Sequence, residues 1–209
     1  MFFYSYLSRL GALSVAMALC ACASTGPKVI ERADSLSSAP DWASVTKGAY
    51  EKEGKHFFLG YITLNEGASK SAAMNMADEK ALSEPMRAIV KEFLDQNQVG
   101  ESVNQGDAVG QRVISATRGY RPPMPGLHIT NRYWETVMVP TAEGKPRIEL
   151  RVYSLAGIPS SEYAEAKKAA LQNLSGNNEV KKILDDVGAR QRDAVLGGNK
   201  SESGGASNK

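Results

Sequence analysis

Two alternating stretches, residues 127–139 and 147–156, most constrain what this chain can fold into. In the second stretch Ile148, Leu150 and Val152 fall on one side and charged or aromatic residues on the other, which is the period of a half-buried strand. The connection between the stretches is short, and parallel strands would need a much longer crossover. We therefore expect an antiparallel strand pair here.

One strand and two helical segments are predicted before this pair. Residues 57–64 are apolar on both alternating sides, so we expect a strand covered on two sides, either by a helix on each face or by another protein. Ala73, Ala77 and Ala81 then recur one helical turn apart, and a second apolar stripe follows Pro85. Proline lacks a backbone donor and collides with the preceding turn, so the helix should kink or restart there.

Two further helices are predicted after the pair. One is expected from Ser160, a candidate N-cap, through about residue 174, and an amphipathic helix should follow over about 180–195. The order strand, helix, helix, strand, strand, helix predicts an α+β fold, in which helices pack against a small antiparallel sheet.

Composition narrows the class of function. The chain has 25 basic and 23 acidic residues without a long run of either sign, so nothing indicates a nucleic-acid partner. A hydrophobic content of 42% favours a packed core over a wholly disordered chain.

The N-terminal residues have the layout of a secretory signal. Arg9 precedes an uncharged apolar run that ends near the small residue Ala21. The run is too short for a comfortable membrane span, which takes about 20 residues. Leu19-Cys20-Ala21-Cys22 resembles the lipobox of bacterial lipoproteins, with Cys22 at the acylated position. Cys20 fits less well, because bulky Leu19 would stand where a small residue is needed. The alternative is an ordinary cleaved signal with two incidental cysteines.

An acylated Cys22 would be the one cysteine of the mature chain. That excludes an intrachain disulfide, a cysteine metal cluster and a cysteine nucleophile. Attachment to the membrane would be by this covalent lipid alone, with no other cofactor. The predicted organisation is a signal peptide over 1–21, a flexible lipidated tether over 22–39, the α+β domain over 40–175, an amphipathic helix over 176–196 and a disordered tail over 197–209.

Few residues suit catalysis or metal binding. His56 and His128 are far apart in the sequence and have no cysteine nearby, so we expect polar strand-end residues rather than a metal site. Residues 67–71 lack the first glycine and the spacer of a phosphate loop, and Ser69 is expected to be a helix N-cap. The sequence also holds no Gly-x-Ser-x-Gly elbow. We therefore expect a non-enzymatic protein without a metal.

Several short motifs occur in order between about residues 39 and 172. They are Ala39-Pro40-Asp41-Trp42, Gly48-Ala49-Tyr50, Gly54-Lys55-His56-Phe57-Phe58-Leu59-Gly60, Asn75-Met76-Ala77-Asp78-Glu79-Lys80-Ala81, Ile129-Thr130-Asn131-Arg132-Tyr133-Trp134 and Val152-Tyr153-Ser154-Leu155-Ala156.

Behind a lipobox, this series resembles the bacterial lipoprotein-20 family, small outer-membrane lipoproteins whose relatives include lipoproteins of flagellar outer-membrane rings. The resemblance implies a structural or assembly role at the periplasmic face of the outer membrane, with no catalytic residues. Its partners would be other envelope proteins or further copies of itself. The chain departs from the family in the proline-rich segment 121–126 and the long loop 140–146.

A second resemblance gives an alternative function. Leu82-Ser83-Glu84-Pro85-Met86-Arg87-Ala88 is similar to the helix of peptidoglycan-binding domains in outer-membrane proteins. Here Arg87 comes one residue late, which turns a helical side chain by about 100°, and no Gly-x-Thr-Asp loop supplies the acidic partner. Peptidoglycan binding is therefore the alternative to a scaffold role.

Four residues of the strand pair form the candidate interface. Arg132, Trp134, Arg151 and Tyr153 could gather on one face of the sheet, together with Arg147. Exposed aromatic residues with arginine are typical anchors of protein interfaces. The alternative is that a C-terminal helix covers Trp134 and Tyr153 and the charges merely surround it.

Overall fold

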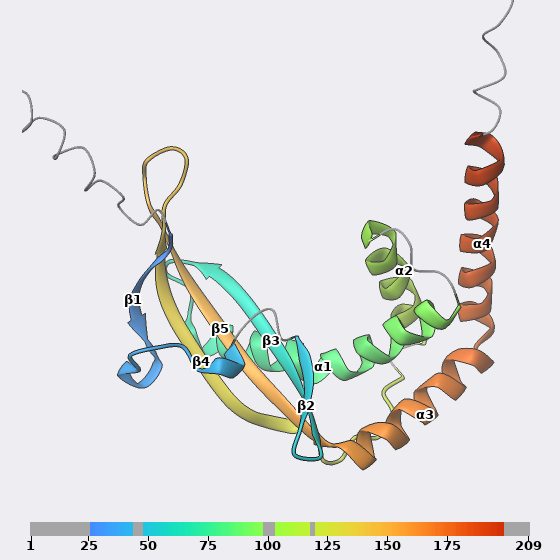
Figure 1. Cartoon of the computed structure of the whole chain (residues 1–209), viewed down its shortest axis with the longest axis horizontal. Helices are drawn as coiled ribbons and strands as arrows, with labels where there is room; N and C mark the ends of the chain where they lie inside the picture. The colour runs from blue at the N-terminus through green and yellow to red at the C-terminus, as the bar shows by residue number, and fades with distance from the viewer. Residues whose placement is uncertain (1–25, 44–47, 98–102, 118–119, 199–209) are drawn as a thin grey trace, which may run out of the picture.

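The computed structural model describes residues 26–43, 48–97, 103–117 and 120–198. These residues form a five-stranded antiparallel sheet and four α-helices, which is the α+β fold expected from the sequence (Figure 1). The strands are β1 (Lys28–Arg32), β2 (Ala49–Lys52), β3 (Lys55–Asn65), β4 (His128–Val139) and β5 (Arg147–Pro159); the helices are α1 (Lys70–Gln96), α2 (Val103–Ala116), α3 (Ser160–Gly176) and α4 (Asn178–Gly198). The strand order is β1-β4-β5-β3-β2.

The predicted strand pair forms the centre of the sheet. β4 and β5 are antiparallel, with Thr136 opposite Leu150 and Trp134 opposite Val152. The register shifts between Ile129 and Asn131 in β4, and such a bulge moves the following side chains to the other face of the sheet. The alternation predicted for β5 is confirmed, because Leu150 and Val152 pack together with α1.

The predicted flexible tether over 22–39 is wrong for residues 28–35. Residues 28–32 are strand β1, which pairs with β4 so that Lys28 lies opposite Met138 and Arg32 opposite Glu135. A short helical turn, η1 (Ala33–Ser35), follows directly. Five residues of mixed polarity carry little strand signal of their own, and the partner strand that stabilises them lies about a hundred residues further along the chain.

Strand β3 is covered on both faces, but not by two helices. α1 lies so close to one face that a Cβ on Gly60 would stand 2.1 Å from the Ala77 carbonyl oxygen. On the other face Leu59 packs with Ala43 and Trp42, which belong to the short turn η2 (Asp41–Ala43). The sequence therefore predicted burial on both sides. The second face is covered by the short turn η2 of the same chain, and not by a second helix or another protein.

Helix α1 is one continuous helix from Lys70 to Gln96 with Pro85 inside it, so the helix does not restart at this proline. Proline in a helix interior costs about 3 kcal/mol. Burial on both sides offsets that cost: Ala73 and Ala77 pack on the sheet, and Ile89 and Phe93 enter a second cluster. The expected cap is present, since the Ser69 hydroxyl accepts a hydrogen bond from the Ala72 amide.

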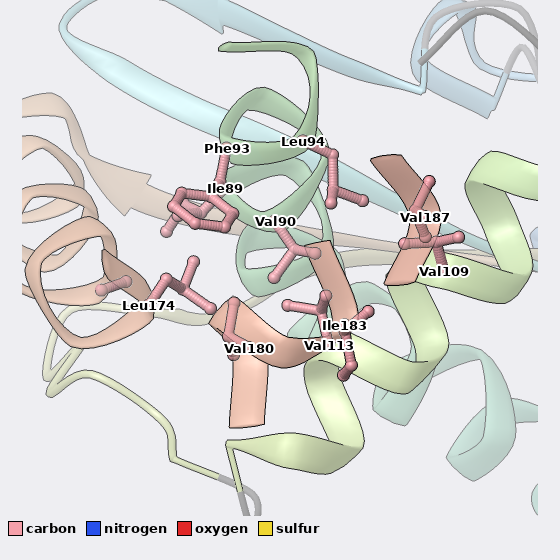
Figure 2. Close-up of a cluster of buried hydrophobic side chains, with 11 residues drawn as sticks. Ile89, Val90, Phe93, Leu94, Val109, Val113, Leu174, Val180, Ile183 and Val187 are labelled. Carbon is pink, nitrogen blue, oxygen red and sulfur yellow. The ribbon is translucent and has the colours of Figure 1, made fainter. Parts of the chain in front are cut away.

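The second half of α1 packs with α2, α3 and α4 beyond the sheet (Figure 1). Figure 2 shows the cluster of buried side chains that joins them, which comprises Ile89, Val90, Phe93, Leu94, Val109, Val113, Ala170, Leu174, Val180, Ile183 and Val187. The first turns of α4 thus belong to the domain core, and the predicted boundary at 175/176 does not separate two structural units.

The structure corrects two smaller predictions about the C-terminal half. Ser160 is not an N-cap but the first residue of α3, and its hydroxyl donates a hydrogen bond to Glu51. α4 continues to Gly198, so residues 197 and 198 are helical, and the rest of the predicted tail lies outside the described residues.

Candidate functional site

The face of the sheet under α1 carries a partly buried polar contact between helix and strands. Asp78 of α1 accepts hydrogen bonds from the Ser154 hydroxyl at 2.6 Å and from Arg132 Nε and Nη2 at 3.0 and 2.8 Å. Burial alone would raise the pKa of Asp78, but the bonds from Arg132 and Ser154 outweigh burial and lower it. The carboxylate therefore stays charged and fixes α1 to β4 and β5.

A cation lies over an aromatic ring near the start of α1. Lys70 Nζ is 3.5 Å from the centroid of the Trp134 ring. The same ammonium group forms an ion pair with Glu31 of β1 at 3.2 Å. Trp134 also packs beside Ala73 and Ala77. This indole is thus an internal contact of the domain, and it connects the N-terminus of α1 to the edge strand.

The opposite face of the sheet carries three packed tyrosines. The Tyr153 ring lies 4.9 Å from Tyr61 and 5.6 Å from Tyr133, centroid to centroid. Tyr133 donates a hydrogen bond to Glu135 at 2.9 Å, and burial together with this carboxylate raises the pKa of Tyr133 to about 12. Burial also raises the pKa of Tyr153. Both phenols remain neutral over the physiological range.

A buried carboxylate stands between two arginines on this face. Glu149 is 6% exposed, and its two oxygens pair with Arg147 and with Arg151, the latter at 3.1 Å. Burial would raise the pKa of Glu149, but the two guanidinium groups lower it. The carboxylate is therefore held as an anion and is not suited to act as a general acid near neutral pH.

The four residues of the candidate interface do not share a face. Residues directly opposite each other in adjacent strands point to the same side of a sheet. Arg132 and Trp134 lie opposite Ser154 and Val152, whereas Tyr153 lies opposite Tyr133. Arg132 and Trp134 therefore point toward α1, and Arg151 and Tyr153 point away from it.

The alternative for these residues is also wrong. α1, rather than a C-terminal helix, packs against Trp134. Tyr153 is 5% exposed and packs with Ala33 and Ala43, which lie in the two short turns after β1. The sequence reasoning failed here because the register of the strand pair places Trp134 opposite Val152 and Val137 opposite Glu149, so the polar and apolar residues of the two strands do not line up on common faces.

Sequence reasoning also missed the acidic partners in these networks. Glu149 could have been found, since Arg147, Glu149 and Arg151 alternate on one strand face. Asp78 and Ser154 are far apart in the sequence, and no local pattern connects them. The carboxylates of Asp78 and Glu149 both bind arginines of the same chain. Their role in these contacts is to stabilise the packing of α1 and the strands.

The two histidines lie at strand ends, as predicted. His56 is the second residue of β3, 3.8 Å from Glu51 and with its ring 4.6 Å from that of Tyr163. His128 begins β4, and its Nδ1 lies 2.8 Å from the Gly126 carbonyl oxygen. In the part of the chain that the structure describes, no three His, Cys, Asp or Glu side chains are placed to hold a metal ion.

The predicted signal peptide and both cysteines, Cys20 and Cys22, lie outside the described residues. Among the helices that are described, none combines the length and apolar character needed to cross a membrane. The lipid attachment therefore stays a prediction from the sequence.

The fold and these contacts define an α+β protein whose five-stranded antiparallel sheet carries a long helix on one face and a tyrosine cluster on the other. Comparison of the chain with models of protein families, with curated proteins and with solved structures gives no match.

Proposed function

We propose that this chain is a non-enzymatic lipoprotein of the bacterial cell envelope. It is anchored by acyl chains on Cys22 and acts as a structural or assembly component at the periplasmic face of the outer membrane. The observation that carries the proposal is Leu19-Cys20-Ala21-Cys22 at the end of the N-terminal apolar run. At about 0.8 kcal/mol for each buried methylene, two or three long acyl chains hold a domain stably on a membrane.

The position of β1 makes the proposed anchor short. Five residues lie between Cys22 and Lys28, the first residue of β1, and such a link spans at most about 20 Å when fully extended. Since β1 is hydrogen-bonded to β4, an anchor at Cys22 would also hold the sheet close to the membrane. A short link of this kind suits a component with a fixed place at a membrane better than a domain that reaches across the periplasm.

A scaffold role agrees with how the polar groups of the sheet are used. The carboxylates of Asp78 and Glu149 bind arginines of the same chain, so they stabilise the architecture instead of facing a substrate. The expected partners are other envelope proteins or further copies of the chain. The lipoprotein-20 resemblance, whose relatives include flagellar ring lipoproteins, makes a flagellar assembly one candidate.

The anchor is tested by metabolic labelling with a clickable fatty acid in a bacterium that processes lipoproteins. We expect label on the wild type and on Cys20→Ala, and none on Cys22→Ala. Cys20→Ala is the matched control, because Cys20 lies in the part of the chain that cleavage removes. Equal labelling of all three chains would refute anchoring at Cys22, and label in the inner-membrane fraction alone would refute the outer-membrane location.

Self-association is tested separately by analytical ultracentrifugation of the unacylated mature chain, with Cys22 replaced by serine. Assembly predicts a sedimentation coefficient that rises with protein concentration. A strict monomer at high concentration would contradict self-association and leave heterologous envelope proteins as the partners.

One observation favours peptidoglycan binding as the second candidate. The motif around Arg87 lies on an unbroken helix, and the Arg87 guanidinium is half exposed, 3.8 Å from Glu84. Against this reading, Asp78 of the same helix is engaged by Arg132. Sedimentation with purified sacculi decides: binding predicts retention by the wild type, loss in Arg87→Ala and retention in the control Lys91→Ala.

A further inference from the structure

Four large hydrophobic side chains stay well exposed among the described residues. They are Ile30 at 51%, Leu36 at 43%, Met76 at 48% and Leu82 at 39%. Met76 and Leu82 lie on α1. Ile30 lies in β1, and Leu36 directly follows η1. Scattered exposed hydrophobics are normal in soluble proteins, but Ile30 and Leu36 are close in sequence and belong to the same edge of the sheet.

The turn that carries Leu36 has a strained, well-fixed backbone. Asp34 and Ser35 have φ angles of 51° and 55°, the left-handed region that residues other than glycine rarely adopt. Two bonds close the turn: the Leu36 amide donates to the Ala33 carbonyl at 3.2 Å, and Arg32 Nη1 donates to the Ser37 carbonyl at 2.7 Å. Ala33 is buried beneath the turn while Leu36 is not.

β1 is also an edge strand. It pairs with β4 on one side, and no described strand pairs with its other side. Figure 1 shows β1 and the turn after it at the outer border of the sheet, on the side away from α2, α3 and α4. An exposed edge strand is normally covered or made unattractive to other strands by charged residues, and β1 carries the exposed Ile30 among its charged residues.

We propose that this edge, with Ile30 and Leu36, rests on the phospholipid surface of the membrane that holds Cys22. The inference depends on the proposed lipid anchor and adds the orientation of the domain to it. Seven residues lie between Cys22 and Ile30, a link of about 28 Å at full extension, so the edge cannot leave the neighbourhood of the bilayer. The two apolar side chains enter the interfacial layer, and α2, α3 and α4 face the periplasm.

The exposed charges beside the edge are of both signs, Lys28 and Glu31 in β1 and Asp34 in the turn. Lys28 begins β1, and a lysine next to an apolar side chain can place its stem along the interface and its ammonium among phosphates. Glu31, which would repel anionic lipids, is paired with Lys70. A second copy of the chain paired along β1 is the competing occupant, and the experiment below separates the two.

The test uses the acylated full chain with one cysteine introduced at a time. An acylated Cys22 leaves no free thiol, so Ile30→Cys and Leu36→Cys can each carry a single environment-sensitive fluorophore. Met76→Cys and Leu82→Cys are matched controls, since they replace equally exposed hydrophobics on α1. The proteins are reconstituted into vesicles of phosphatidylcholine and phosphatidylglycerol that contain lipids with a nitroxide near the headgroup.

We expect the nitroxide to quench the probes at 30 and 36 several-fold more than those at 76 and 82, at every ratio of protein to lipid. Equal quenching at all four positions would overturn the inference. Shielding of positions 30 and 36 that appears only at high ratios of protein to lipid, without nitroxide quenching, would assign the edge to a second copy and overturn it as well. Fatty-acid label is measured on the same samples: its absence refutes the anchor, whereas label with equal quenching refutes only the orientation.

Discussion

The close approach of α1 to the sheet at Gly60 leads to the strongest prediction. A Cβ at this position would stand 2.1 Å from the Ala77 carbonyl oxygen and 2.5 Å from the Ala81 amide nitrogen. Both are backbone atoms, so no rotamer change can relieve the collision. In Gly60→Ala the helix must therefore move about 1 Å away from β3, and its alanines lose part of their contacts with the sheet.

The size of the effect follows from the kind of group that must move. Overpacking a core usually costs about 1–3 kcal/mol, and the obstruction by two backbone atoms places Gly60→Ala at the upper end, about 3 kcal/mol. A typical domain is stable by about 5–15 kcal/mol. With a slope of about 2 kcal/mol per molar urea, the midpoint should fall by about 1.5 M.

The assay is urea unfolding of the unacylated mature chain, followed by circular dichroism. Gly176→Ala is the matched control, because a Cβ there meets nothing within 4 Å and the residue lies in α3; its midpoint should stay near that of the wild type. A Gly60→Ala midpoint within about 0.2 M of the wild type would refute the close packing of α1 on β3.

Further predictions concern the polar groups that hold the sheet and α1 together. Asp78→Asn should lower stability by about 1–3 kcal/mol at neutral pH; because the pKa of Asp78 is lowered in the folded protein, its advantage over the variant should shrink as pH falls below about 4, and a constant difference would contradict this role. Glu149→Gln should destabilise by about 1–3 kcal/mol, whereas Glu143→Gln in the exposed loop should have little effect in the same urea assay. The phenol of Tyr133, whose pKa is about 12, should ionise in absorbance titrations of the folded chain well above the ordinary value near 10; ionisation of all tyrosines together near pH 10 would refute its burial.

The elements that local patterns define were predictable from the sequence. Alternation in residues 147–156 identified β5 and the apolar face that meets α1, and the short connection before it required antiparallel pairing with β4. Alanines spaced by one turn identified the side of α1 that meets the sheet. In these cases the period of the side chains and the geometry of the backbone are enough, because the residues that decide the outcome are neighbours in the chain.

Other features depended on contacts between distant residues. β1 forms because it can pair with the edge of β4. Helix α1 stays continuous through Pro85 because the burial of side chains before and after this residue exceeds the cost of one lost hydrogen bond. The prediction of the candidate interface failed for the same reason, since the register between β4 and β5 and the position of α1 determine which face Trp134 occupies.

The sequence by itself determined the α+β class, the antiparallel pair, the helical stripes and the expectation of a lipid on Cys22. Only the tertiary structure decided that residues 28–32 form an edge strand close to that cysteine in sequence, which residues share a face, and that Ile30 and Leu36 remain exposed on that edge. The physical reason is that periodicity fixes which side of an element is apolar, whereas register and burial are set by whichever distant segment packs against it.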